Sequence, residues 1–240
     1  MSRLRCIIPF LCVLLASPVV ADGVLHASSA SSRIAFPAPG QPGHLPAPQR
    51  LAESTLLLWV TPSVSNSGVR SVLSEDGGFA VELDVTDAVW RIRLEGSEQL
   101  EVELPFNKPI ELLDTTTLIG CAWDAASGTL EAWARTESSA TVSSVASSST
   151  YEVTDSMAGL VVGASDSELP AMLGDYGLVV LRSDRLNQSD FDAIFESQHY
   201  FAPMRMEDQG SEIDADSVRW MVNHSVVSDP DWQRIGTSAW

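Results

Sequence analysis

The length, composition and charge of the chain restrict its class. It has 240 residues, of which 45% are hydrophobic and 19% are charged, so it is neither disordered nor collagenous. The 32 acidic residues outnumber the 14 basic ones and give a formal net charge of −18, which argues against nucleic-acid binding and against a polybasic membrane patch. After residue 21 no apolar run reaches the roughly 18 residues of a spanning helix, so the mature chain is expected to have no transmembrane segment.

Residues 1–21 have the pattern of a secretory signal peptide. Arg3 and Arg5 precede an apolar run over residues 6–16, and a small-residue cleavage site ends at Ala21. The sequence therefore predicts a secreted protein, extracellular or periplasmic. Removal of this segment leaves one cysteine, Cys121, so no intramolecular disulfide is expected, and its apolar neighbours predict a buried thiol.

Segments rich in serine, proline or polar residues mark the predicted connections. Residues 22–55 are of this kind, although Ser32–Phe36 alternates weakly and predicts an edge strand. The prolines of residues 37–48 exclude a central strand there, because proline cannot donate to the hydrogen-bond ladder. Residues 138–149 are serine-rich and predict a long loop. The polar extension 204–240 is either an added strand pair or a linker.

Between these connections the chain alternates apolar and polar residues with the period of a β-strand. Trp90, Ile92 and Leu94 fall on one face of such a strand, and Arg91 and Arg93 on the other. Turn residues separate the segments at intervals of about 8–12 residues, as in an all-β antiparallel sandwich or barrel. The predicted strands are 55–60, 69–73, 79–85, 89–94, 99–104, 116–123, 129–135, 159–163 and 174–181.

One short helix is expected near the end of the domain. It is predicted to begin at Ser189, which forms a weak capping box with Asp192. Phe191, Ile194 and Phe195 then repeat at helical spacing. This stripe predicts the face with which the helix docks on the rest of the domain.

Four segments, taken in order, resemble the concanavalin A-like jelly roll in its laminin G-like and pentraxin-like branch. They are Thr55–Pro62, Ala122–Leu130, Leu160–Gly177 and Leu186–Phe195. The resemblance covers about residues 30–202, so residues 22–203 are identified as one laminin G-like domain. It implies a two-sheet antiparallel jelly-roll sandwich that binds extracellular glycan or protein without catalysis. One departure is that Glu131–Arg135 lacks the Asn and Gly with which the family usually continues its hairpin.

The same resemblance implies a candidate calcium site. Pentraxin-like members place Ca²⁺ with acidic residues from an early loop and from the loop after the Leu160–Gly163 strand. Here Glu75 and Asp76 fall in the first position, and Asp166 and Glu168 in the second. Carboxylate oxygens suit this hard cation. The alternative is that these are solvated loop charges of a strongly acidic chain.

Glycan cleavage is the alternative from another functional class. Glu82, Asp84 and Asp87 resemble the Glu-x-Asp-x-x-Glu strand of jelly-roll glucanases, which needs a nucleophile and a general acid close together. The last position departs from that pattern, because it is Asp87 and not glutamate. Strand alternation also explains Glu82 and Asp84 as the solvent face of a strand.

The sequence as a whole therefore favours a secreted, non-catalytic binding module for extracellular carbohydrate or protein. Trp133 shares its strand face with Glu131, and we expect it to be an exposed platform for a sugar ligand. The alternatives are a glycoside hydrolase that uses Glu82, Asp84 and Asp87, and a structural component of the cell surface or envelope.

Overall fold

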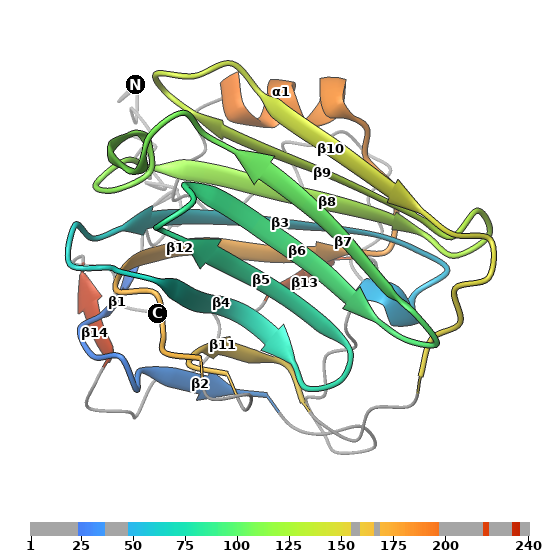
Figure 1. Cartoon of the computed structure of the whole chain (residues 1–240), viewed down its shortest axis with the longest axis horizontal. Coiled ribbons are helices and arrows are strands. Elements are labelled where there is room, and N and C mark those ends of the chain that lie inside the picture. The colour runs from blue at the N-terminus through green and yellow to red at the C-terminus, as the bar shows by residue number, and fades with distance from the viewer. Residues whose placement is uncertain are drawn as a thin grey trace, which may run out of the picture.

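The computed structural model describes residues 24–36, 48–154, 159–165, 169–196, 218–220 and 232–235. They form two antiparallel sheets stacked face to face, the second of which lies in front of the first in Figure 1. Sheet 1 has the order β10 (Val142–Ser147), β9 (Thr129–Thr136), β8 (Thr117–Asp124), β3 (Glu53–Pro62), β12 (Gly174–Arg182), β1 (Val24–Ala27) and β14 (Trp232–Ile235), and β13 (Val218–Trp220) also pairs with β12. Sheet 2 has the order β2 (Arg33–Ala35), β11 (Val161–Gly163), β4 (Val69–Glu75), β5 (Phe79–Asp84), β6 (Val89–Glu95) and β7 (Gln99–Pro105).

The predicted all-β, antiparallel two-sheet jelly-roll sandwich with one short C-terminal helix is confirmed. Its main core lies between the sheets, where every second residue of each strand points inward. In β6, Trp90, Ile92 and Leu94 are buried while Arg91 and Arg93 are half-buried on the outer face. Because burial of one large apolar side chain contributes about 1.5–3 kcal/mol, this interior can stabilise the domain without a disulfide. Cys121 is buried in it, as predicted.

Helix α1 (Gln188–Glu196) covers part of the outer face of sheet 1, at the end that carries β8, β9 and β10 (Figure 1). Its cap corrects the expectation of a start at Ser189. The Asn187 Oδ1 atom accepts the backbone N–H of Ser189 at 2.8 Å, and Asp190 Oδ2 accepts that of Asn187 at 3.1 Å. The reciprocal pair is thus Asn187 with Asp190, a capping box shifted toward the N-terminus.

The apolar stripe of α1 packs as expected. Phe191, Ile194 and Phe195 are buried in a second cluster outside sheet 1. The Phe191 ring lies 5.7 Å from that of Trp133, and the Phe195 ring 5.7 Å from that of Trp59. Since the helix covers β3 from outside, this strand is buried on both faces, which explains its continuous apolar sequence.

Two further differences concern short strands. The serine-rich stretch predicted as a loop contains β10, the edge strand of sheet 1, whose residues alternate between half-buried and exposed. It pairs with β9 from Val142 opposite Ala134 to Ser147 opposite Thr129. Strand β1 lies in a segment for which no strand was predicted. The predicted edge strand near residue 34 is confirmed as β2.

Several predictions fall outside the described residues. These are the signal peptide at residues 1–21, the proline-rich stretch 37–47, and most of the extension 204–240, of which only β13 and β14 are described. The boundaries of the domain, residues 22–203, stay a prediction. Within the described part of the chain, no helix is long and apolar enough to cross a bilayer.

Candidate functional site

The outer face of sheet 2 carries the carboxylates that resemble a glucanase motif. Glu82 and Asp84 lie on β5, between residues whose side chains enter the main core, and are 5% and 6% exposed. Arg93 of β6 donates from Nη2 to the Oε1 atom of Glu82. Arg91, also on β6, donates from Nη1 to the Oδ2 atom of Asp84 at 2.8 Å. Each carboxylate of β5 is therefore paired with an arginine of the neighbouring strand.

Arg91 joins further carboxylates into the same network. Its Nη2 atom lies 3.3 Å from Oδ2 of Asp87 in the β5–β6 turn, and its Nε atom donates to Oε1 of Glu103 on β7 at 2.8 Å. The register of the sheet places Arg91 directly opposite Glu103 on β7, whereas on β5 its direct partner is Glu82 and Asp84 is a diagonal neighbour. Opposite charges on neighbouring strands stabilise a sheet through such cross-strand pairs.

The pKa values of the two carboxylates move in opposite directions. Burial raises the pKa of Glu82, and this effect outweighs the opposing charge of Arg93. Burial also opposes ionisation of Asp84, but the backbone N–H of Asp87 and the Arg91 guanidinium outweigh it and lower its pKa. The same two effects act on both pKa values, and desolvation prevails at Glu82 whereas the hydrogen bonds and the Arg91 charge together prevail at Asp84.

These contacts give Glu82, Asp84 and Asp87 structural partners. A retaining glycosidase keeps two carboxyl groups on either side of an open sugar site, one of them free to act as the nucleophile. Here the oxygens of Glu82 and Asp84 accept hydrogen bonds within the sheet. The arrangement therefore supports an ion-pair ladder and gives no support to a hydrolase.

The proposed calcium ligands are only partly described. Glu75 is 3% exposed, and its Oε1 atom lies 3.2 Å from Nε of Arg50, so its charge is already compensated within the protein. Asp76 lies in the exposed turn that follows. Asp166 and Glu168 lie outside the described residues. In the part of the chain that is described, no three acidic, histidine or cysteine side chains gather as metal ligands would.

The turn that carries Asp76 lies close to Ser165, the last described residue before Asp166. Ser165, the residue before Asp166, lines a small pocket of about 100 Å³ together with Glu75 and Asp76. Calcium binding stays a prediction.

The expectation that Trp133 is an exposed sugar platform is wrong. Its side chain is 0% exposed and lies in the cluster beneath helix α1, with its ring 5.7 Å from that of Phe191. The assigned face was right, because Trp133 points away from the main core that contains Leu130 and Ala132. The helix covers that face, so no ligand can reach the indole ring.

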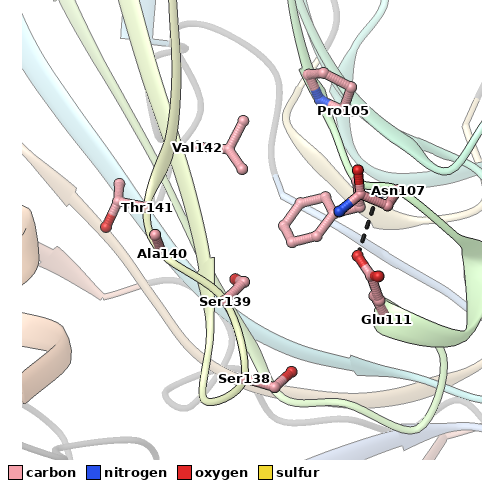
Figure 2. Close-up of a pocket in the computed structure, with 9 residues that line it drawn as sticks. Pro105, Asn107, Glu111, Ser138, Ser139, Ala140, Thr141 and Val142 are labelled. Carbon is pink, nitrogen blue, oxygen red and sulfur yellow. Dashed lines mark hydrogen bonds between the residues drawn. The ribbon is translucent and has the colours of Figure 1, made fainter.

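A pocket of about 480 Å³ lies at the side of the sandwich where β7 and β10, the edge strands of the two sheets, approach one another (Figure 1). One wall comes from the end of β7 and the short helix η2 (Pro109–Glu111), and the other from the β9–β10 connection. Figure 2 shows Asn107 and Glu111 facing Ser139, Ala140 and Val142 across the opening. The remaining lining residues are Pro105, Phe106, Ser138 and Thr141.

Hydrogen bonds and burial fix the first wall. The backbone N–H of Phe106 donates to the carbonyl of Ala88 at 2.8 Å, and its ring is largely buried. The Glu111 Oε2 atom accepts the backbone N–H of Asn107 at 3.1 Å (Figure 2). The turn of η2 is anchored by Leu112, which is 1% exposed. These contacts hold the carboxylate of Glu111 at the pocket without a neutralising cation among the lining residues.

The second wall is tied to sheet 1 and to helix α1. The backbone N–H of Thr136 donates to Ser139 Oγ at 3.1 Å, which closes the turn after β9. Thr141 Oγ1 donates to Asp192 of helix α1. Arg135 lies 3.3 Å from the same carboxylate. Both walls are thus part of the rigid framework, which favours a preformed pocket.

The pocket joins an apolar patch to several hydrogen-bonding groups. Pro105, Phe106 and Val142 supply apolar surface, while serine hydroxyls, an amide and one carboxylate supply donors and acceptors. Its volume falls in the range of small-molecule sites, about 300–1,000 Å³. A ligand with both C–H faces and hydroxyl groups matches this combination. No sequence motif pointed to it, because the walls are separated along the chain and contain no paired charges.

Comparison with known proteins identifies the fold. No protein-family model matches the chain, and no curated protein matches it in sequence. The CBM40 module of the Ruminococcus gnavus IT-sialidase, solved bound to α2,3-sialyllactose, is 12% identical, with a TM-score of 0.52 over 70% of this chain and 94% of that one. A heptameric SAP-like pentraxin from Limulus polyphemus is also 12% identical, with a TM-score of 0.53 over 85% and 97%. The chain shares their jelly-roll fold.

Proposed function

We propose that this jelly roll is a non-catalytic carbohydrate-binding module that holds its ligand in the pocket between η2 and the β9–β10 connection. The observation that carries the proposal is the composition of that pocket, in which apolar side chains from both walls, Pro105, Phe106 and Val142, lie beside serine hydroxyl, amide and carboxylate groups. Sugars present the same two kinds of surface. The likeness to a carbohydrate-binding module in fold supports this reading.

The contacts on sheet 2 favour binding over hydrolysis. The carboxylates that a glucanase-type enzyme would use are paired with Arg91 and Arg93. We therefore propose that glycan is bound and released unchanged. This part of the proposal would be overturned if the protein released reducing sugar from a polysaccharide and the Glu82→Gln variant did not.

The pocket itself can be tested by narrowing it. Ala140 is exposed at the opening, and Ala140→Leu adds bulk there without removing a hydrogen bond. Ala126→Leu makes the same change in the exposed β8–β9 turn, outside the pocket, and serves as the matched control. Binding to a glycan array should weaken at least fivefold in Ala140→Leu and stay unchanged in Ala126→Leu. Equal binding by both variants would contradict the assignment of this pocket.

We also propose that the protein is exported and belongs to the laminin G-like branch of the fold. The first 21 residues support export, and the four segments that resemble that branch support the second proposal. N-terminal sequencing of the mature protein should then begin at Asp22. A mature chain that still begins at Met1 would contradict export through a cleaved signal peptide.

We also propose that the protein binds Ca²⁺ through Asp76 and Asp166. Millimolar Ca²⁺ should raise the melting temperature, because an ion that binds only the folded state stabilises it by mass action. The rise should vanish in Asp76→Asn and in Asp166→Asn. The matched variant Asp114→Asn, in a separate loop, should keep it. No rise in the parent protein would end the proposal.

A further inference from the structure

The pocket proposed for glycan carries a single charge. Glu111 is the one ionisable residue among the nine that line it. Its side chain is half-buried, and it accepts the backbone N–H of Asn107 at 3.1 Å. A ligand that enters this pocket therefore meets a fixed negative charge.

No cationic side chain lines the pocket, since Lys108, which follows Asn107 in the chain, is exposed and lies outside the lining. Arg135, on the strand that leads into the pocket wall, lies 3.3 Å from Asp192 and also contacts Glu196. Its guanidinium lies 4.4 Å above the ring of Phe195, toward helix α1. Five other arginines also form ion pairs with carboxylates of this chain: Arg50, Arg91, Arg93, Arg182 and Arg185.

Resting on the proposed function, we infer that this pocket selects uncharged sugars and rejects sugars that carry a carboxylate, sialic acid included. An acidic sugar would place its carboxylate near Glu111 with no guanidinium among the lining residues to compensate it. The net charge of −18 adds a repulsive field over a wider range. The ligand preference thus differs from that of the sialyllactose-bound module with which the chain shares its fold.

An uncharged sugar uses the same carboxylate favourably. Its hydroxyl groups can donate to Glu111, and a hydrogen bond to a charged acceptor is stronger than one between neutral groups. On the opposite side Ser139 can donate, since its oxygen already accepts from Thr136, and Ser138 and the Asn107 side chain can donate or accept. The polar groups of the pocket can therefore form hydrogen bonds with the hydroxyl groups of an uncharged sugar, and no additional charge is needed.

The test compares matched glycans and matched variants. The purified protein is applied to a glycan array on which neutral glycans stand beside the same glycans capped with sialic acid or a uronic acid. The tightest neutral glycan and its capped counterpart are then measured by titration calorimetry. We expect the neutral member to bind at least tenfold more tightly. Glu111→Gln should weaken neutral binding about 10–100-fold, the range for losing one hydrogen bond to a charged acceptor.

Glu137→Gln is the control, because it removes the same charge as Glu111→Gln. Glu137 is exposed and lies next to the pocket loop in the chain, but it is not among the residues that line the pocket. Its affinity should stay within twofold of the parent. Melting curves show whether each variant is folded. A salt series on the parent provides a second measurement, since added salt should strengthen any residual binding of the acidic glycan by screening repulsion.

The outcomes are distinct. Tighter binding of capped than of neutral glycans, or neutral binding that is unchanged in Glu111→Gln, overturns the inference and leaves a glycan-binding function in place. No binding to any glycan on the array overturns the proposed function itself. Neutral preference that depends on Glu111 and is unchanged in Glu137→Gln supports both.

Discussion

Helix α1 rests on Gly120, a residue of β8 whose lack of a side chain allows the helix to approach the sheet. A Cβ atom at this position would lie 2.8 Å from Cδ2 of Phe191 and 3.1 Å from Cδ2 of Leu57. Carbon atoms in contact prefer about 3.5–4.0 Å. We therefore predict that Gly120→Ala moves the Phe191 ring and, with it, the docking of the helix.

The magnitude follows from two opposing effects. Overpacking a filled interior costs about 1–3 kcal/mol. Alanine also reduces the conformational entropy of the unfolded chain relative to glycine, which stabilises the folded state by about 0.4–1 kcal/mol. The net expectation is destabilisation by about 1–2 kcal/mol. In a domain of this size, each kcal/mol lowers the melting temperature by about 2–4 °C, so calorimetry should show a fall of roughly 2–8 °C.

A double-mutant cycle checks the cause. Phe191→Leu removes the ring atoms nearest to the added methyl group, so Gly120→Ala should cost less in that background than in the parent. Residues in contact couple in this way, whereas distant residues add. A melting temperature equal to or above the parent in Gly120→Ala would refute the reasoning, as would an equal cost in both backgrounds.

Three further predictions concern single residues. Trp133→Ala should lower the free energy of unfolding by about 3–5 kcal/mol in urea titrations, because the indole ring fills the cluster under the helix, while the fraction that stays folded keeps its glycan binding. Asp84→Asn should cost about 1–3 kcal/mol at neutral pH, because it removes the charge and the carboxylate oxygen that pair with Arg91, although the amide oxygen can still accept the backbone N–H of Thr86. Since the folded pKa of Asp84 lies below its ordinary value of 3.8, this stability is present above pH 3.8 and is lost as the pH falls through the folded pKa, so unfolding curves of parent and variant should converge in acid. Burial raises the pKa of Cys121 to about 12, so its thiol should react with a disulfide reagent only in denaturant, and fast reaction of the native protein would contradict its burial.

The period-two pattern was sufficient to predict most of the sandwich. In β6 it assigned Trp90, Ile92 and Leu94 to the interior, because a half-buried strand must alternate. The stripe of Phe191, Ile194 and Phe195 predicted the docking face of the helix for an equally local reason. Both patterns are written in consecutive residues, so a single sequence can reveal them.

The errors arose where a distant segment decides the environment. Alternation places Trp133 on the outer face of its strand. That pattern carries no information on helix α1, whose Phe191 packs against the indole ring. The same limit applies to Glu82, since its pairing with Arg93 depends on the register of neighbouring strands. The serine-rich sequence of β10 lacks the alternation of apolar and polar residues that predicts a strand, because an edge strand with half-exposed residues needs few apolar side chains.

The pocket could not be predicted from the sequence for a related reason. Its walls come from Pro105–Glu111 and from Ser138–Val142, two segments that the fold brings together at one side of the sandwich (Figure 2). Each segment by itself looks like an ordinary connection, rich in proline in one case and in serine in the other. The signal lies in their juxtaposition, which requires the three-dimensional arrangement.

The way in which the two sheets use their outer faces explains why a ligand would bind at the side of the sandwich. A ligand on the outer face of sheet 1 near Trp133 would have to displace helix α1 and expose its apolar cluster. A ligand above Glu82 and Asp84 on sheet 2 would have to compete with arginine partners already in contact, and a buried carboxylate left without its partner is costly. At Glu111 neither cost arises, because its carboxylate holds one backbone N–H and has acceptor capacity left for hydroxyl groups. Recognition there adds hydrogen bonds to the structure without breaking any that hold it together.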